Sequence, residues 1–254
     1  DVEALGALIR PDTTLVSIMA VNNEIGSIQP IEAISKLLVD KPTISFHVDA
    51  VQALAKIPTE NYLTDRVDFA TFSSHKFHGV RGVGFVYIKS GKKITPLLTG
   101  GGQEHDYRST TENVAGIAAT AKALRLSMEK LDIFASKTGQ MKAVIRQALL
   151  DYPDIFVFSD EEDFAPHILT FGIKGVRGEV IVHAFEDYDI FISTTSACSS
   201  KAGKPAGTLI AMGVDKDKAQ SAVRLSLDLE NDMSQVEQFL TKLKLIYNQT
   251  RKVR

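Results

Sequence analysis

The first half of the chain is dominated by short apolar runs that are rich in β-branched and aromatic residues. They are "TLVSIMAV" (14–21), "TISFHVDA" (43–50), "VDFATFSS" (67–74) and "GVGFVYI" (82–88). Near-continuous apolar runs with helical patterns between them are typical of the buried strands of an α/β sheet. We therefore predict an α/β fold with a mostly parallel sheet, and a helix over residues 31–38 that connects two of its strands.

Helical periodicity becomes stronger after the fourth run. Residues 114–128 place five apolar residues on one face, which predicts an amphipathic helix: Val114, Ile117, Ala118, Ala121 and Leu124. A break near 129–134 then separates a domain over residues 1–131 from a smaller C-terminal α/β domain over residues 132–254.

The predicted second domain opens with a long helix around residues 134–150. Strands are expected near 155–159, 166–173 and 190–194, followed by a final helix. That helix has a stripe of residues at helical spacing, which we interpret as core: Val236, Phe239, Leu240, Leu243, Ile246 and Tyr247.

Composition limits the classes of function. The chain has 254 residues and a net charge of −2, so it has no general attraction to nucleic acid or to an anionic membrane. No apolar run reaches the ~18 residues of a membrane span, and no signal peptide opens the chain. A single cysteine, Cys198, excludes an intrachain disulfide and indicates a cytoplasmic protein. Because the chain begins at Asp1, we expect it to be part of something longer.

Polar residues cluster where the predicted strands end. Asn22–Glu24 follow the first run, His47 and Asp49 with Gln52 close the second, and Ser73–Lys76 close the third. Ligands of open α/β sheets bind at the carboxyl ends of the strands. Lysine is usually a surface residue, but Lys76 has an aspartate, a glutamine and a serine–histidine pair on neighbouring strand ends. That set matches what pyridoxal phosphate (PLP) needs.

Other ligand sites fit the sequence less well. "GVRGVG" (79–84) has the wrong glycine spacing for a dinucleotide loop, and "GGGQE" (100–104) lacks the lysine and hydroxyl of a phosphate loop. A zinc site could use His47, Asp49, His75 and His78, but the H-x-x-H spacing is not a helical i, i+4 pair. We therefore predict no metal.

Five motifs together resemble the cysteine desulfurases, a sulfur-mobilising branch of the class V aminotransferases. They are "VNNEIGSIQP" (21–30), "HVDAVQ" (47–52), "SSHKFHGVRGVGFVYI" (73–88), "GGGQEHDYRSTTEN" (100–113) and "SACSSK" (196–201). The resemblance implies the PLP-dependent transferase fold type I. It also implies that residues 1–131 form the PLP-binding large domain without its N-terminal part, which in the family supplies a histidine stacked on the cofactor ring.

The resemblance also implies roles for the strand-end residues. Lys76 would form the Schiff base with PLP, and Asp49 would pair with the protonated ring nitrogen. Gln52 would hydrogen-bond the phenolate oxygen, while Ser73 and His75 would hold the phosphate. The residues that we expect to be catalytic are Cys198, Lys76 and His75.

Three further residues receive roles from the same resemblance. Asn23 would lie beside the ring and the substrate. Thr111 matches a threonine that reaches the phosphate of the neighbouring subunit, which implies a homodimer, although Thr110 stands where the family more often has glycine. Arg224 matches the arginine that clamps the substrate carboxylate, a task that suits its planar fork. Taken alone, Arg224 would be read as a surface residue on an edge strand.

Cys198 is the remaining functional candidate. A lone cysteine is usually a small buried hydrophobe, but "STTSACSSKAGKPAG" (193–207) has the composition of an exposed loop. In the family the loop cysteine takes the sulfur of L-cysteine as a persulfide and leaves L-alanine. The sulfur would then pass to an acceptor protein, either an iron–sulfur scaffold or a tRNA-thiolation enzyme. The alternatives are another class V enzyme, such as an aminotransferase or a selenocysteine lyase, and a catalytically silent fragment.

Overall fold

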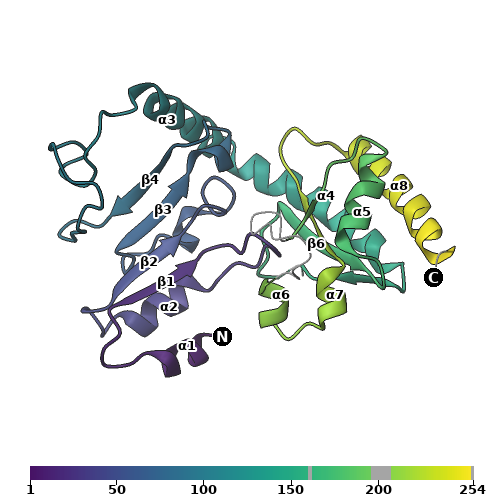
Figure 1. Cartoon of the computed structure of the whole chain (residues 1–254), viewed down its shortest axis with the longest axis horizontal. Helices are drawn as coiled ribbons and strands as arrows, with labels where there is room; N and C mark the ends of the chain where they lie inside the picture. The colour runs from purple at the N-terminus through teal and green to yellow at the C-terminus, as the bar shows by residue number, and fades with distance from the viewer. Residues whose placement is uncertain (160–161, 196–206, 253–254) are drawn as a thin grey trace. The chain divides into compact units, whose positions relative to one another are not determined.

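The computed structural model describes residues 1–159, 162–195 and 207–252. The chain forms two compact units (Figure 1). The first contains Asp1–Ala20 and Gln29–Leu131, and the second contains Val21–Ile28 and the chain from Asp132 onward. The short segment Val21–Ile28 therefore leaves the first unit directly after its first strand and returns to it before the first long helix. Each unit is described by itself below.

The first unit is built on a four-stranded sheet in the order β1-β2-β3-β4. Its strands are β1 (Leu15–Met19), β2 (Ser45–Asp49), β3 (Phe69–Ser73) and β4 (Gly84–Ile88). β1, β2 and β3 are parallel, and β4 pairs antiparallel with β3. All four strands fall within the apolar runs, and the predicted mostly parallel α/β sheet is confirmed.

One face of this sheet is buried and the other is open. Val16, Phe46, Val48 and Ala70 are buried, whereas the residues between them are half-buried or exposed. The expectation of buried strands therefore holds for one face of β1 to β3 only, and β4 is exposed along most of its length. Polar side chains such as Ser17 and His47 occupy part of the open face, but apolar side chains such as Leu15 and Met19 are exposed as well.

The helices of the first unit are α1 (Val2–Leu8), α2 (Ile31–Leu38) and α3 (Val114–Met128), with short 3₁₀ turns η1 (Thr59–Asn61) and η2 (Ser74–Phe77). The bounds predicted for the helix over 31–38 are confirmed, and α2 buries Ile31, Ile34 and Leu38.

The predicted helix over 114–128 is confirmed in its bounds, but its predicted apolar face is wrong. Val114 is 72% exposed and Ile117 is exposed as well, whereas Gly116 and Thr120 are the buried residues of α3. Thr120 lies against η2, where its hydroxyl meets that of Ser74 at 2.9 Å. Small residues allow this close approach, so the contact face of α3 is not its most apolar face.

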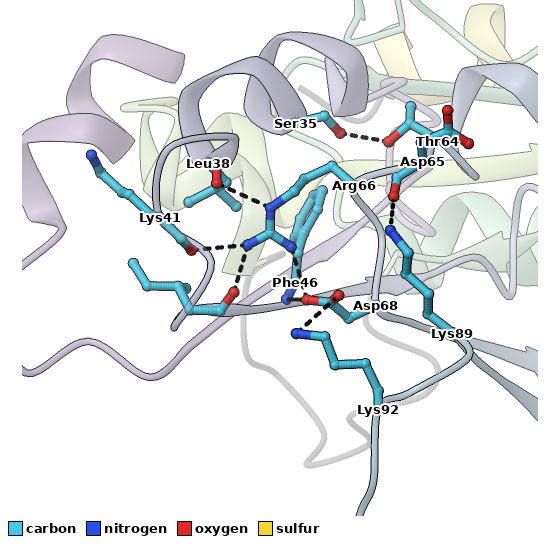
Figure 2. A network of polar contacts seen from close by, with 11 residues as sticks. Ser35, Leu38, Lys41, Phe46, Thr64, Asp65, Arg66, Asp68, Lys89 and Lys92 are labelled. Carbon is cyan, nitrogen blue, oxygen red and sulfur yellow. Dashed lines mark hydrogen bonds and ion pairs between the residues drawn. The ribbon is translucent and has the colours of Figure 1, made fainter.

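A network of polar contacts holds β2 and β3 together at their amino ends (Figure 2). Asp68, directly before β3, accepts the backbone N–H of Phe46 at 2.9 Å and an Arg66 Nη1 bond at 2.8 Å. The Arg66 guanidinium also donates to three backbone carbonyl oxygens, those of Leu38 at 3.0 Å, Lys41 at 3.1 Å and Ile44 at 2.6 Å. Lys92 Nζ lies 3.2 Å from the other Asp68 oxygen.

The second unit has an antiparallel sheet in the order β5-β6-β8-β7. Its strands are β5 (Ile155–Val157), β6 (Ile168–Ile173), β8 (Ala222–Ser226) and β7 (Ser193–Thr194). Its helices are α5 (Gly178–Glu186), α6 (Gly207–Ala211), α7 (Lys216–Gln220) and α8 (Met233–Lys252), together with α4 (Leu131–Leu150), which begins at the boundary of the units.

The core of the second unit confirms the predicted stripe of the final helix. Val236, Phe239 and Leu243 of α8 are buried in one cluster with Phe171 of β6 and Phe185 of α5, and Leu240 packs against this cluster. The Phe185 and Phe239 rings stack with their centroids 4.9 Å apart. Within the described residues, no helix is both long and apolar enough to cross a bilayer.

Candidate active site

The carboxyl ends of β2 and β3 lie at the same edge of the first unit's sheet because the two strands are parallel. Asp49 ends β2 and pairs with Thr71 of β3, and Ser73 ends β3 two residues later. Lys76 follows in η2, directly after β3. Of the three predicted strand ends with polar residues, those of β2 and β3 lie at one sheet edge, whereas Asn22–Glu24, which follow β1, belong to the second unit.

One carboxylate oxygen of Asp49 is fixed by the backbone. Its Oδ1 accepts the N–H of Val51 at 3.0 Å, which closes a tight turn at the end of β2. The other oxygen has no hydrogen-bond partner among residues 1–159, 162–195 and 207–252. Asp49 therefore offers a held carboxylate with one acceptor oxygen available to a ligand.

The turn that holds Lys76 is anchored on both sides by buried residues. Ser74 and Phe77 are fully buried, and the Phe77 carbonyl accepts a hydrogen bond from Ser127 Oγ at 3.1 Å. Lys76 itself is half-buried, and its amine makes no ion pair or hydrogen bond with any residue that the structure describes. A rigid turn thus presents an unpaired amine close in sequence to the end of β3.

Gly79 is required by the close return of the chain after this turn. A Cβ at position 79 would lie 1.9 Å from Ser74 Oγ and 3.0 Å from the Ser74 carbonyl oxygen. The Gly79 N–H donates to that carbonyl at 3.0 Å. The "SSHKFHG" motif is therefore a local structural unit in which Ser74, Phe77 and Gly79 shape the turn, while Lys76 stays half-buried with its amine unpaired.

The other predicted site residues of the first unit lie at the end of β3, in the turns after β2 and β3, and in the segment before α3. Gln52 lies in the turn after β2 and is half-buried, as is Ser73. His75 is exposed in η2, and Thr111 is exposed in the irregular segment before α3. In the described parts of the chain, no group of three or more His, Cys, Asp or Glu side chains could hold a metal ion.

Asn23 and Arg224 come together in the second unit. Arg224 Nη1 donates to the Asn23 carbonyl oxygen at 2.7 Å across 201 positions of sequence. β8, which holds Arg224, pairs with β6 on one side and β7 on the other, so the reading of Arg224 as an edge-strand residue is wrong. The arginine is half-buried and bound to the loop that contains Asn23.

The loop around Asn23 is held by Asn22, its neighbour in the predicted polar cluster, and by Thr170, which the sequence analysis did not single out. Asn22 Oδ1 accepts the N–H groups of Glu24 at 2.8 Å and Ile25 at 3.0 Å. Thr170 Oγ1, on β6 beside Arg224, donates to the Glu24 carbonyl at 2.6 Å. The asparagine before a turn was a usable local signal. Thr170 had none, because its partner is 146 positions away.

Cys198 lies outside the residues that the structure describes, as do Lys201 and Lys204 of the same motif. Its expected role stays a prediction from the sequence.

Comparison with known proteins gives consistent matches along the chain. The family profile described as aminotransferase class-V matches residues 1–239. A NifS/IcsS protein homolog of Lactobacillus delbrueckii subsp. bulgaricus is 51% identical over 252 residues, which are 99% of this chain and 66% of that protein. A cysteine desulfurase of Trichormus azollae is 36% identical over 241 residues, 94% of this chain and 60% of that protein.

A solved structure of a NifS-like protein has the same fold. It superposes with a TM-score of 0.88 at 37% identity, and the match covers 98% of this chain and 65% of that one. The predicted fold class is thereby confirmed. The chain spans 60–66% of the length of these relatives.

Proposed function

Because the chain belongs to the class-V aminotransferase family, we propose that it is part of a PLP-dependent cysteine desulfurase. This enzyme converts L-cysteine to L-alanine and moves the sulfur to an acceptor. The relatives named "NifS/IcsS protein homolog" and "Cysteine desulfurase" support this choice. The observation that supports it most is the sheet edge in the first unit, where the held carboxylate of Asp49 and the unpaired amine of Lys76 follow neighbouring parallel strands.

The side chains at this edge have the chemistry that PLP requires. The available Asp49 oxygen can accept a hydrogen bond from the ring nitrogen, and the Lys76 amine can bond covalently to the aldehyde carbon. We assign Gln52 to the phenolate oxygen, Ser73 and His75 to the phosphate, and Thr111 to the phosphate in a partner subunit of a homodimer. When bound, PLP supplies an electron sink that weakens the bonds at the α-carbon of an amino acid.

The residues of the second unit receive the substrate roles. We assign Arg224 to the carboxylate of L-cysteine, since a guanidinium fork binds a carboxylate with two parallel hydrogen bonds. Its bond to the Asn23 carbonyl holds the arginine side chain in one orientation before substrate arrives. Asn23 is thereby assigned a place next to the substrate.

We assign the sulfur transfer to Cys198. Its thiolate attacks the sulfur of the substrate, a new S–S bond forms as the C–S bond breaks, and the electron pair of the broken bond stays with carbon. Protonation of that carbon completes alanine, and Cys198 is left as a persulfide. We assign to the Lys76 amine the movement of protons at the α-carbon of the substrate. We further propose that the enzyme acts in the cytoplasm and passes sulfur to an iron–sulfur scaffold or a tRNA-thiolation enzyme.

Reductive labelling tests the cofactor assignment. The purified protein is incubated with PLP, reduced with borohydride, digested and mapped by mass spectrometry. We expect the pyridoxyl group on Lys76. A label on another lysine, or no specific label, contradicts the assignment.

Product analysis then separates a desulfurase from the other class V enzymes. The Cys198→Ser variant should still be labelled on Lys76 but should form almost no alanine from L-cysteine. Normal alanine formation by this variant would instead indicate a lyase that acts directly on the substrate.

A further inference from the structure

The proposed function gives no role to His47, a half-buried histidine of β2. It lies two residues before Asp49 on β2, so both side chains project from the same, open face of the sheet. His47 Nδ1 lies 2.7 Å from Ser17 Oγ on β1, and His47 Nε2 lies 3.1 Å from Thr71 Oγ1 on β3. One imidazole therefore joins three adjacent parallel strands through both of its nitrogens.

The strand register shows in which direction this bridge runs. On β1, Ser17 is the direct pairing partner of His47. On β3, however, the direct partner of His47 is Phe69, and Thr71 is the partner of Asp49. The ring thus extends toward the carboxyl end of the sheet and contacts the β3 residue that is paired with Asp49.

The charge of Asp49 also acts on this ring. Burial is the main cause that lowers the pKa of His47, and the Asp49 carboxylate opposes it by raising that pKa. With its pKa below the ordinary value, His47 is mainly neutral at neutral pH. A neutral imidazole has one donor and one acceptor nitrogen, and hydroxyl groups such as those of Ser17 and Thr71 can satisfy either.

We propose that His47 is a positioning residue that, with Ser17 and Thr71, holds the end of β2 so that the Asp49 carboxylate keeps the cofactor ring nitrogen protonated. The Val51 N–H holds one oxygen of Asp49, and the other oxygen is available. The orientation of the carboxylate therefore depends on how firmly the carboxyl end of β2 is fixed. The bridge supplies that constraint from β1 and β3 together. The inference rests on the proposed function, because it needs PLP at Asp49.

The test measures the protonation of the ring nitrogen directly. The protein is loaded with PLP that contains ¹⁵N in its ring, and the ¹⁵N chemical shift is followed from pH 6 to pH 9.5 in wild type, His47→Leu, Asp49→Asn and the double variant. We expect His47→Leu to lower the midpoint of ring deprotonation by about one pH unit, a tenfold effect. In the Asp49→Asn background, His47→Leu should change the shift hardly at all, because the residue acts through Asp49.

Two further variants distinguish positioning from general stability. His47→Gln, which keeps a donor and an acceptor, should recover a large part of the wild-type midpoint. Ser35→Ala is the matched control: it removes a hydroxyl–hydroxyl bridge to Thr64 of 2.7 Å in the same unit and should leave the midpoint unchanged.

Each outcome decides between the ideas. If His47→Leu changed the midpoint of ring deprotonation equally in the wild-type and in the Asp49→Asn background, His47 would have a merely structural role and the inference would be overturned. An unchanged midpoint in both His47→Leu and His47→Gln would also overturn it. If wild type itself gave no bound ¹⁵N signal, the proposed function and this inference would both fail. If wild type binds PLP but the effects of His47→Leu and Asp49→Asn are independent, the inference about His47 is overturned and the proposed function is not.

Discussion

Replacement of Arg66 by methionine should destabilise the first unit strongly. The substitution keeps much of the apolar stem but removes the guanidinium that joins Asp68 to three backbone carbonyls. The side chains of Arg66 and Asp68 are only 14% and 3% exposed, so water cannot replace the lost partner fully. The Asp68 carboxylate would then keep the Phe46 N–H and Lys92 as partners.

The magnitude follows from the burial of the pair. Breaking a buried ion pair by removing one partner costs about 3–5 kcal/mol. Lys92 still compensates part of the Asp68 charge, but the three backbone carbonyls lose their donor as well. We therefore expect Arg66→Met to lower the free energy of unfolding of this unit by that amount. The control is Arg125→Met, which breaks an i, i+4 pair with Glu129 whose side chains are both 54% exposed. An exposed pair of this kind contributes less than about 0.5 kcal/mol.

The pH dependence gives a second readout of the same network. Burial alone would raise the pKa of Asp68, but hydrogen bonds from the Phe46 N–H, Arg66 and Lys92 outweigh it, and the pKa is lowered. A carboxylate with a lowered folded-state pKa stabilises the protein above its unfolded pKa of about 4, and this stability is lost as the pH falls through the folded pKa. Asp68→Asn should therefore show a weaker loss of stability than wild type between pH 5 and pH 2.

The assay is equilibrium urea unfolding followed by far-UV circular dichroism, with hydrogen exchange read by mass spectrometry on peptides from residues 41–73. Hydrogen exchange assigns the transition to β2 and β3 rather than to the second unit. A loss below about 1 kcal/mol for Arg66→Met, similar to the Arg125→Met control, would refute the reasoning that this network fixes the two strands.

Three further predictions concern the proposed site. Asp49→Asn should retain bound PLP, seen as visible absorbance, but lose most of the exchange of the α-proton of bound L-alanine with deuterium, because the ring nitrogen loses its anionic partner; equal exchange in both proteins would argue against Asp49. Gly79→Ala should destabilise the first unit by about 1–3 kcal/mol and lower borohydride labelling of Lys76, because the added Cβ would lie 1.9 Å from Ser74 Oγ. Gly207→Ala is the control, since a Cβ at that position meets no atom within 4 Å. Arg224→Lys should raise KM for L-cysteine at least tenfold with a smaller change in kcat, because one charge replaces a two-pronged contact; an unchanged KM would remove the carboxylate role.

The apolar runs predicted the strands of the first unit well because each run is short and is closed by turn residues. β1 to β4 all lie inside the predicted ranges. The runs did not predict that β4 is antiparallel to β3, since parallel and antiparallel neighbours have the same local pattern. They also did not predict the open face, because it exposes apolar residues such as Leu15, Met19 and Phe85, which a sequence pattern assigns to the interior.

Long-range pairing limited the prediction of the second unit. The strand near 190–194 was expected to be five residues long, but β7 is confined to Ser193–Thr194. The helix α5 was not predicted, and the strand that holds Arg224 was expected only as an edge strand, whereas β8 lies between β6 and β7. The assignment of Val21–Ile28 to the second unit was not foreseen either, because it depends on contacts such as that between Arg224 and Asn23.

The candidate site shows the same division between local and distant information. The turn around Lys76 was recognisable from seven consecutive residues, and the structure explains its serine, phenylalanine and glycine as turn-forming groups. The bridge from His47 to Ser17 and Thr71 was not recognisable, because it depends on which strands are neighbours and in what register.

The most direct test of the proposed function is the intact mass of the protein after treatment with L-cysteine in the presence of PLP and without reductant. Cys198 is the single thiol in the chain, so no other cysteine can accept the sulfur. We predict a mass increase of one or more sulfur atoms, located on the peptide that contains Cys198, removed by dithiothreitol and absent from Cys198→Ser. An unchanged mass of the wild type, with L-cysteine still consumed, would contradict the transfer of sulfur to this residue.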